Sequence, residues 1–174
     1  FWLGCADADV YRFLKYFTFL EVSEIDEIEK ADAERQGRPE AQAVLAREVT
    51  RLVHGEEGLV AAQRITESLF SGSIDVLAEG DWAQLRQDGL PSSSMSRGGF
   101  PETLTQLLTE AGMAASGKQV KDALGRNAVT VNSQPVGWGS NADVAGCFDP
   151  AAALYERYYL VKLGKKKYHL FEIS

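Results

Sequence analysis

The spacing of apolar residues changes along the chain, and this change limits the folds that it can adopt. Before residue 89, apolar side chains recur at three- and four-residue steps, as at Val10, Leu14 and Phe17. That period is typical of helices that bury one face. Beyond residue 127 the pattern becomes that of strands, as at Val129 and Val131. We therefore expect a mainly α-helical bundle followed by a small α+β domain with a short mixed or antiparallel sheet.

Capping and terminating residues predict five helices in the first part of the chain. The expected boundaries are a start near Asp7, a capping box at Ser23 and Asp26, an end at Gly37, a start at Pro39, an end at His54 and Gly55, an end at Gly72 and a cap at Asp81. Trp82 and Leu85 would face inward from the fifth helix.

Residues 89–100 are rich in Gly, Ser and Pro, a composition typical of a linker or exposed connection. The expected domains are therefore residues 1–88 and 101–174. In the second domain we expect a helix over 101–111, a helix capped by Ser116 and Gln119, a strand over 128–132, and a hairpin made by 155–163 and 167–173.

The two halves differ in charge. The 174-residue chain has a net charge of −7, which taken alone argues against a nucleic-acid partner. Residues 1–88 carry 9 basic and 18 acidic side chains, a net −9, whereas residues 89–174 carry 9 and 7, a net +2. The two halves therefore have different electrostatic characters, which the net charge of the whole chain conceals.

Several classes of protein are not indicated. The chain contains no phosphate-binding Gly-rich loop, no dinucleotide-binding Gly motif and no pair of His residues at metal-ligand spacing. Cys5 and Cys147 lie too far apart to suggest a zinc site or a disulfide framework, which fits a reducing compartment. We expect no membrane span and no secretory signal, and the first residue, Phe1, suggests a fragment of a longer polypeptide.

Five lysines in the second half are candidate RNA ligands. Lys118 and Lys121 share one face of the helix that Ser116 begins, where cations oppose the helix dipole and so suggest a purpose beyond stability. Lys165, Lys166 and Lys167 follow Gly164 at the expected hairpin turn. If both groups face one way, they would neutralise about four phosphates. The alternative for the turn is a solubilising role.

Other polar residues are given structural roles. Acidic residues between Glu24 and Glu34 cover nearly all sides of a helix, as expected for a solvated surface. His54 is expected at a helix end, and His169 is expected to be a packing or surface residue within the last strand.

The sequences of several segments, and their order along the chain, resemble the carboxy-terminal part of bacterial-type tyrosyl-tRNA synthetases. They include Ala-Asp-Ala-Asp-Val-Tyr-Arg-Phe-Leu at 6–14, Ala-Arg-Glu-Val-Thr-Arg-Leu-Val-His-Gly at 46–55, Leu-Phe-Ser-Gly at 69–72, Ala-Val-Thr-Val-Asn at 128–132 and Leu-Gly-Lys-Lys-Lys-Tyr at 163–168. The segment from Ser116 to Asn132 also resembles an RNA-binding module shared with the fourth protein of the small ribosomal subunit. The resemblance covers nearly the whole chain.

This resemblance implies a helical anticodon-binding domain and a ribosomal-protein-like RNA-binding domain that hold the anticodon and variable arms of tyrosine tRNA. ATP and Mg²⁺ would serve a catalytic domain absent from this chain, so the fragment alone would be inactive and need no cofactor. The parent enzyme would form a homodimer through that domain, and the fragment would be a monomer. The expected location is the cytoplasm, with the mitochondrial matrix as an alternative, and DNA is not an expected partner.

Site residues also follow from the resemblance. Lys118, Lys121, Lys165 and Lys166 match basic positions that hold the tRNA backbone, and Asp7 matches an acidic position that contacts the first anticodon base. Asp7 could equally be a helix cap. The chain departs from the family at Gly117, where a basic residue is common, at Leu163, which interrupts an often doubled basic pair, and at Lys118 and Lys121, where Arg is usual.

Two other functions compete with this interpretation. The charge of −9 on the first half would suit a helical protein-interaction scaffold with a structural second domain. A fragment of an RNA-modifying enzyme that bears the same module is the third possibility, but it requires a catalytic Asp in a separate domain, and the helical region offers no such fold.

Overall fold

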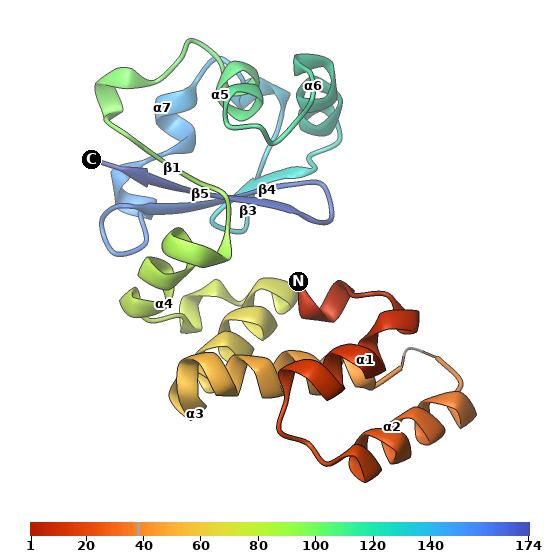
Figure 1. Cartoon of the computed structure of the whole chain (residues 1–174). Helices are drawn as coiled ribbons and strands as arrows, with labels where there is room; N and C mark the ends of the chain where they lie inside the picture. Colours follow the sequence, from red (N-terminus) through yellow and green to blue (C-terminus); the bar gives the residue numbers. More distant parts are fainter. Residues whose placement is uncertain (38) are drawn as a thin grey trace. The chain divides into compact units, whose positions relative to one another are not determined.

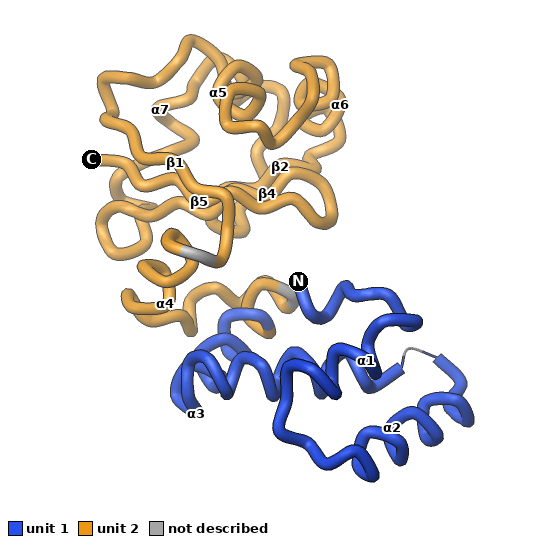
Figure 2. Tube along the Cα trace, in the orientation of Figure 1, with its two compact units in different colours: residues 1–66 blue, residues 67–174 orange. Residues whose placement is uncertain are grey.

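The structure, a computed structural model, describes residues 1–37 and 39–174, apart from the side chains of Phe70 and Asp88. The chain divides into two compact units, residues 1–66 and 67–174 (Figure 2). Each unit is described by itself.

Unit 1 is helical, as the apolar spacing predicts. Its elements are the 3-10 turn η1 (Trp2–Gly4), α1 (Asp7–Phe17), α2 (Val22–Glu34) and α3 (Ala41–Ser71), whose last residues belong to unit 2. Val10 and Leu14 of α1 pack with Ile25 of α2 and Leu45 of α3 in a fully buried core. The helical stripe of α1 therefore faces the centre of the unit.

One boundary in unit 1 differs from the expected one, and another is confirmed. Helix α2 begins two residues earlier, because Glu21 rather than Ser23 is its N-cap and the backbone N–H of Glu21 donates to the carboxylate of Glu24 at 2.9 Å. The expected break at His54 and Gly55 is confirmed, because Gly55 has non-helical angles, φ of 72° and ψ of −177°, and α3 consists of two helical segments joined by a kink there. A positive φ of this kind favours glycine.

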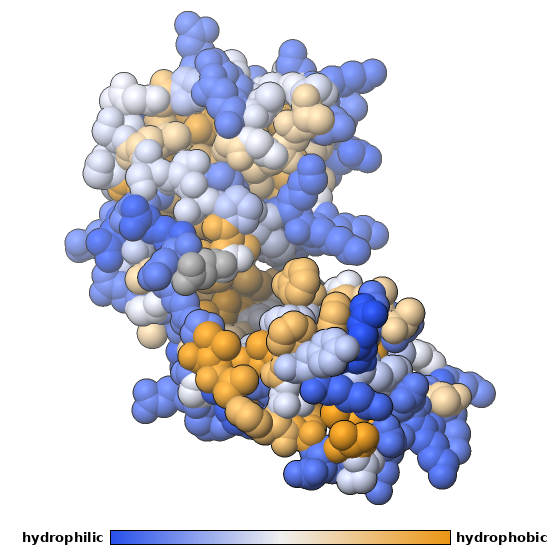
Figure 3. All heavy atoms as spheres, in the orientation of Figure 1, coloured by the Kyte–Doolittle hydropathy of each residue, from blue (hydrophilic) through white to orange (hydrophobic). Residues whose placement is uncertain are grey.

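Large apolar side chains remain exposed on unit 1. Leu52 and Val53, whose helical spacing suggests an inward face, are 53% and 65% exposed, and Phe19 is 88% exposed. Apolar atoms gather on the visible face of this unit (Figure 3). The apolar stripe on α3 therefore includes side chains that the core of unit 1 does not bury.

The Asp32 carboxylate joins the three helices of unit 1. It accepts hydrogen bonds from the hydroxyl of Tyr11 on α1 at 3.1 Å and from the backbone N–H groups of Glu40 and Ala41, at the start of α3, at 2.7 and 3.0 Å. Burial alone would raise the pKa of Asp32, but these three donors outweigh it and hold that pKa below its ordinary value. Burial and the bond to Asp32 raise the pKa of Tyr11 to about 12, so its hydroxyl stays a donor.

Unit 2 is built on a five-stranded mixed sheet in the order β1-β5-β4-β2-β3, as the expected fold class allows (Figure 1). The strands are β1 (Ser92–Met95), β2 (Val129–Val131), β3 (Gln134–Val136), β4 (Tyr158–Leu163) and β5 (Lys167–Ile173). Only the β1–β5 pair among these is parallel. The expected terminal hairpin is confirmed as β4–β5.

One face of the sheet packs against helices, which Figure 1 shows as α5, α6 and α7. Their bounds are α5 (Leu104–Glu110), α6 (Gly117–Gly125) and α7 (Val144–Cys147). Leu108 of α5, Leu124 of α6 and Phe148, which follows α7, contact Val161 and Phe171 in one buried core. Period-two alternation in the strands supplies the inward side chains.

The other face of the sheet is covered by the segment that precedes β1. This segment contains η2 (Ile74–Val76), α4 (Glu79–Gln84) and a π-helical turn, η3 (Leu85–Gly89). Trp82 is fully buried and stacks on Tyr158 of β4, with ring centroids 6.4 Å apart. The hydroxyls of Tyr168 and Tyr155 donate to the backbone oxygens of Leu69 and Leu77.

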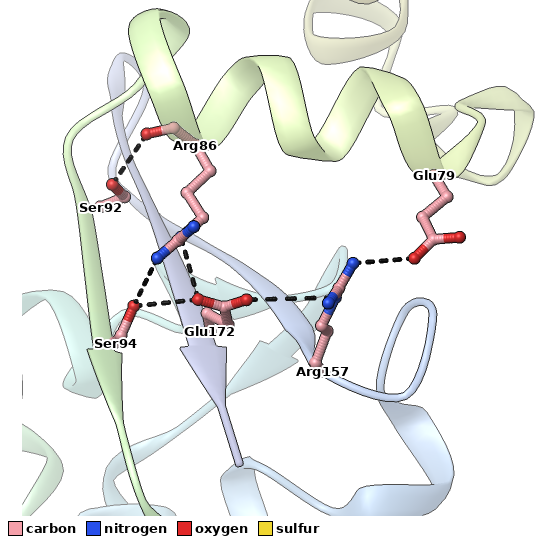
Figure 4. Close-up of polar contacts among 6 residues, drawn as sticks. All are labelled: Glu79, Arg86, Ser92, Ser94, Arg157 and Glu172. Atoms are coloured by element: carbon pink, nitrogen blue, oxygen red, sulfur yellow. Dashed lines mark hydrogen bonds and ion pairs between the residues drawn. The ribbon is translucent and has the colours of Figure 1, made fainter.

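Charged groups fasten α4 and η3 to the sheet (Figure 4). Glu172 of β5 pairs with Arg86 at 2.9 Å and approaches Arg157 at 4.0 Å, and Arg157 also pairs with Glu79 at 2.8 Å. The hydroxyl of Ser94 on β1 donates to Glu172 at 3.0 Å. Residues 79–94 are therefore part of the sheet domain.

This arrangement differs from the expected division at residues 88 and 100. The units meet at residue 66, because Trp82 and Leu85 bury their side chains within unit 2. The Ser-rich segment expected to be a linker contributes β1, whose backbone pairs with residues 170–173. A low content of bulky residues did not prevent pairing, since backbone hydrogen bonds are independent of side chains.

Three further details depart from the sequence-based expectation. Asp81 is not an N-cap, because it lies inside α4 and accepts from the backbone N–H of Ala78 at 2.8 Å. Helix α5 begins at Leu104 rather than Pro101, with Thr103 as its cap. Strand β3 was not expected, and it pairs with β2 through a turn at Asn132 and Ser133 whose φ angles are both positive.

No helix within the described ranges is both long enough and apolar enough to cross a membrane.

Candidate nucleic-acid interface

Helix α6 presents two of the predicted lysines to solvent. Val120 and Leu124 are fully buried in the core of unit 2, while Lys118 and Lys121 lie on the exposed part of the helix. Ser116 is the N-cap but its side chain makes no capping bond, and Gln119 instead accepts from the backbone N–H of Ala115 at 3.1 Å. The predicted capping box therefore does not form, because Gln119 reaches the residue before the N-cap and Ser116 makes no capping bond.

The turn between β4 and β5 presents two more lysines. Gly164 has a φ of 66°, which allows the tight reversal, and Lys165 and Lys166 are exposed beside it. The ammonium of Lys167 differs, because it donates to the backbone oxygen of Met113 at 3.0 Å. Lys167 therefore anchors the turn and has fewer donors left for a ligand.

The lysine turn is bonded to the segments on both sides of α6. Lys167 reaches Met113, in the loop that leads into α6, and the N–H of Gly164 donates at 2.7 Å to the backbone oxygen of Ala128, just after α6. In Figure 1 the β4–β5 turn and α6 lie toward the same side of the domain. Two bonds between residues 54 and 36 positions apart in sequence thus join the turn to the segments that flank α6.

The four exposed lysines are not neutralised by neighbouring carboxylates. Among the described residues, Lys118, Lys121, Lys165 and Lys166 have no acidic partner within 4.0 Å and no side-chain hydrogen bond. Their charges are thus available to phosphates.

Sequence reasoning did not single out Arg126. It is exposed just after α6, and its Nε donates to the backbone oxygen of Asp122 at 3.1 Å, while it shares an open hollow with Lys121. The sequence feature that could have identified Arg126 was its position, five residues after Lys121. Lys162 instead lies over the ring of Tyr168 at 5.2 Å, on the face of the sheet away from α6.

Asp7 lies in unit 1, at the first position of α1. The interpretation of Asp7 as a cap is wrong, because Ala6 is the N-cap and no side chain caps this helix. The Asp7 carboxylate instead accepts from Nε2 of Gln42 at 2.6 Å. Gln42 is 2% exposed and its Oε1 has no partner, so its amide orients a carboxylate that is otherwise exposed. The role of Asp7 in reading a base stays a prediction.

The histidines and most of the acidic run have the structural roles expected. His169 is buried, accepts or donates one hydrogen bond with Ser93 at 2.9 Å and packs on Phe171, and burial lowers its pKa. His54 is exposed and lies directly before the kink at Gly55, where the first helical segment of α3 ends. The acidic side chains of α2 are exposed, except that Asp32 is partly buried.

The described residues contain no group of three or more His, Cys, Asp or Glu side chains that could hold a metal ion. Both cysteines, Cys5 and Cys147, are free thiols.

Two family models match the chain. Residues 81–171 match the tyrosine–tRNA ligase SYY-like C-terminal domain, and residues 1–71 match the class I tRNA synthetases (W and Y). The first match covers β1 to β4 completely and β5 up to residue 171. The resemblance found in the sequence is therefore confirmed.

Curated relatives agree with the family models. The tyrosine–tRNA ligases of Aliivibrio fischeri and Salmonella paratyphi B are each 48% identical to this chain, over 171 and 170 residues. The tyrosine–tRNA ligase of Aliivibrio salmonicida is 47% identical. Each alignment covers 98% of this chain but 38% of the relative, so the chain spans well under half of their length. With a family model matching more than half of its residues, the chain belongs to the tyrosine–tRNA ligase family and carries its C-terminal domain.

Proposed function

We propose that this chain is the tRNA-holding region of a tyrosine–tRNA ligase and that unit 2 grips the tRNA backbone. The observation that carries the proposal is the set of unpaired lysines on α6 and on the β4–β5 turn, which is bonded to the segments flanking α6. A surface of four free ammonium groups would attract phosphates and release counterions. Lys167 would contribute mainly by fixing the turn.

Unit 1 would recognise the anticodon arm through Asp7, and unit 2 would hold the variable arm. A carboxylate can accept hydrogen bonds from guanine, and the Gln42 amide holds one Asp7 oxygen in place while the other stays available. Arm recognition rests on the family resemblance together with this geometry. In this proposal unit 1 reads a base and unit 2 binds the tRNA backbone.

The ligase reaction belongs to the proposed whole enzyme rather than to this chain. That enzyme would attach tyrosine to its tRNA with ATP and Mg²⁺, dimerise through its catalytic domain and act in the cytoplasm. No step of that reaction is assigned to residues of this chain. This chain would contribute by positioning the tRNA for the catalytic domain of that enzyme.

The test is binding of a tyrosine tRNA transcript to the 174-residue chain as salt is raised. Affinity should fall steeply with salt, and Lys118→Glu with Lys165→Glu should weaken binding at least about tenfold and reduce the salt slope by about 2. Lys15→Glu with Lys30→Glu, on the helices of unit 1, changes the net charge equally and serves as the control. Equal losses from the two pairs would contradict the assigned surface.

Nuclease footprinting on the same complexes would locate the contacts. We expect protection of the anticodon and variable arms by the wild-type chain, and loss of the variable-arm protection in the α6 and turn variant. Protection confined to the acceptor end would contradict the proposal.

A protein-binding role remains the second candidate for unit 1. The exposure of Phe19, Leu52 and Val53 favours it, because exposed apolar groups of this size often mark protein interfaces. No RNA binding at low salt, together with specific capture of a protein by unit 1, would favour this scaffold function.

A further inference from the structure

Unit 2 carries a groove that the lysines alone do not explain. It lies among α5, α6 and the 3-10 turn η5 (Trp138–Ser140), with a volume of about 530 Å³. Its lining includes Thr105, Gln106, Lys121, Trp138 and Asn141. This volume lies within the range of about 300–1,000 Å³ that is typical of small-molecule sites.

Trp138 is the unusual member of this lining. Its side chain is 52% exposed and, among the described residues, its indole N–H donates no hydrogen bond. The other large apolar side chains exposed in the described part of unit 2 are Val76 and Tyr155, and Tyr155 is held by its hydroxyl on Leu77. Glycines on both sides of Trp138 leave the indole without bulky sequence neighbours. An aromatic ring of this size is usually buried.

The backbone that carries Trp138 is fixed in place. Asn141 donates its N–H to the backbone oxygen of Trp138 at 3.1 Å, and its own backbone oxygen accepts from Leu104 at 2.8 Å. The Asn141 side-chain oxygen accepts from the N–H and the hydroxyl of Thr105, at 3.0 and 2.5 Å. The turn is therefore fastened to the start of α5, so the indole is presented from a rigid support.

Helix α6 lies close against α5 at this groove. A Cβ added at Gly117 would be 3.0 Å from the methyl of Thr105, so glycine permits the close approach. This contact gives a physical reason for glycine at a position where a basic residue is common in the family. It also brings Lys121 to the lining that contains Trp138.

The charges of the groove favour an anionic occupant with an aromatic group. Lys121 lines it without an acidic partner among the described residues, and Lys118 is one turn away on the same helix. Glu110 also lines the groove, and its carboxylate accepts from Gln106 at 2.8 Å. A nucleotide matches this set, because its base can stack on an indole and its phosphate can pair with an ammonium.

We propose that Trp138 is a stacking platform for one unpaired base of the bound RNA, whose adjoining phosphates rest on Lys121 and Lys118. The inference rests on the proposed tRNA-binding function and adds a single-stranded contact to it. Stacking of this kind accepts any base, since each base has an aromatic face. The groove would therefore select an unpaired nucleotide rather than a sequence.

The experiment compares Trp138→Leu and Trp138→Phe in the 174-residue chain, with a tyrosine tRNA transcript and a blunt RNA duplex as probes. Trp138→Leu should weaken tRNA binding by about 5- to 150-fold, as expected for one lost base stack, and leave the salt slope unchanged. Trp138→Phe should keep most of the affinity. Binding of the duplex, which has no unpaired base, should be unaffected by either change.

Fluorescence gives a second measurement that does not depend on a disruptive variant. Binding of the tRNA should quench the emission of wild-type protein, and the quench should be clearly smaller in Trp138→Phe, since Trp82 is buried and any quenching of Trp2 in unit 1 is common to both proteins. An equal quench in both proteins would overturn the inference.

The outcomes also separate this inference from the function on which it rests. Full tRNA affinity in Trp138→Leu, with the Lys118→Glu and Lys165→Glu loss intact, would overturn the stacking platform and leave RNA binding standing. Absence of any lysine effect would refute the binding surface itself.

Discussion

Unit 1 and unit 2 handle their apolar residues differently. The described core of unit 1 centres on a few residues of three helices, such as Leu14 and Ile25, and large apolar groups such as Phe19 remain exposed. Unit 2 covers both faces of its sheet, so Phe148 on one side and Trp82 on the other are fully buried. The exposed lysines of unit 2 therefore lie over a closed core, whereas unit 1 leaves part of its apolar surface uncovered.

The largest expected effect tests whether the two cores are independent. Phe148→Ala should destabilise unit 2 by about 3–5 kcal/mol, because its ring packs on Phe100, Tyr159 and Phe171. Leu14→Ala, the matched change in unit 1, should cost about 2–5 kcal/mol there. Hydrogen exchange measured by mass spectrometry would show which segments open. Equal loss of protection in both units from either change would break the comparison.

A middle-sized effect is expected at the junction of the three helices in unit 1. Asp32→Asn removes a charged acceptor from two backbone N–H groups and from Tyr11, and should cost about 1–2 kcal/mol at neutral pH, since partial exposure lets water replace part of the bonding. Urea unfolding would measure it. Asp26→Asn is the control, because the Asp26 carboxylate bonds only to exposed Lys15 among the described residues, and it should cost under about 0.5 kcal/mol.

The same residue gives unit 1 a pH dependence with a definite sign. Because the folded pKa of Asp32 lies below its ordinary value, the ionised carboxylate stabilises the fold. That stabilisation is complete above about pH 4 and is lost as pH falls through the depressed pKa. Asp32→Asn should flatten this part of the curve, and an unchanged acid transition would contradict the assignment.

The smallest effect is expected on the exposed surface of unit 1. Leu52→Gln and Val53→Gln should each change stability by no more than about 0.5 kcal/mol, because these side chains are largely in water and glutamine suits a helix. Leu45→Gln, at a fully buried position of the same helix, is the control that should be strongly destabilising. Thermal unfolding would measure all three. A loss above about 1 kcal/mol at Leu52 would mean that another surface covers it.

Regular periodicity explains how much of the fold was predictable. The stripe of α1 and the alternation of β4 and β5 carry strong local signals, so their type and approximate bounds followed from the sequence. Strand β1 contains three serines, and β3 contains Pro135, so neither shows a strand pattern. Their pairing depends on neighbours distant in sequence, which local reasoning does not supply.

The candidate site was predictable as a set of charges but not as a surface. Exposed lysines on α6 followed from helical spacing, since Val120 and Leu124 point to the opposite side. The bond of Lys167 to Met113 had no sequence signal, because it joins residues 54 positions apart. Trp138 did have a sequence signal, because it is a bulky aromatic residue between two glycines in a segment without periodic apolar residues.

The layer formed by residues 67–91 has a practical consequence for dissecting the molecule. A truncated piece that begins at residue 101, the boundary suggested by composition, would strip the cover from Tyr158 and Leu160 and leave β5 as a bare edge. Such an edge is a template for aggregation. Excision between residues 66 and 67 would instead keep both hydrophobic layers and all five strands together.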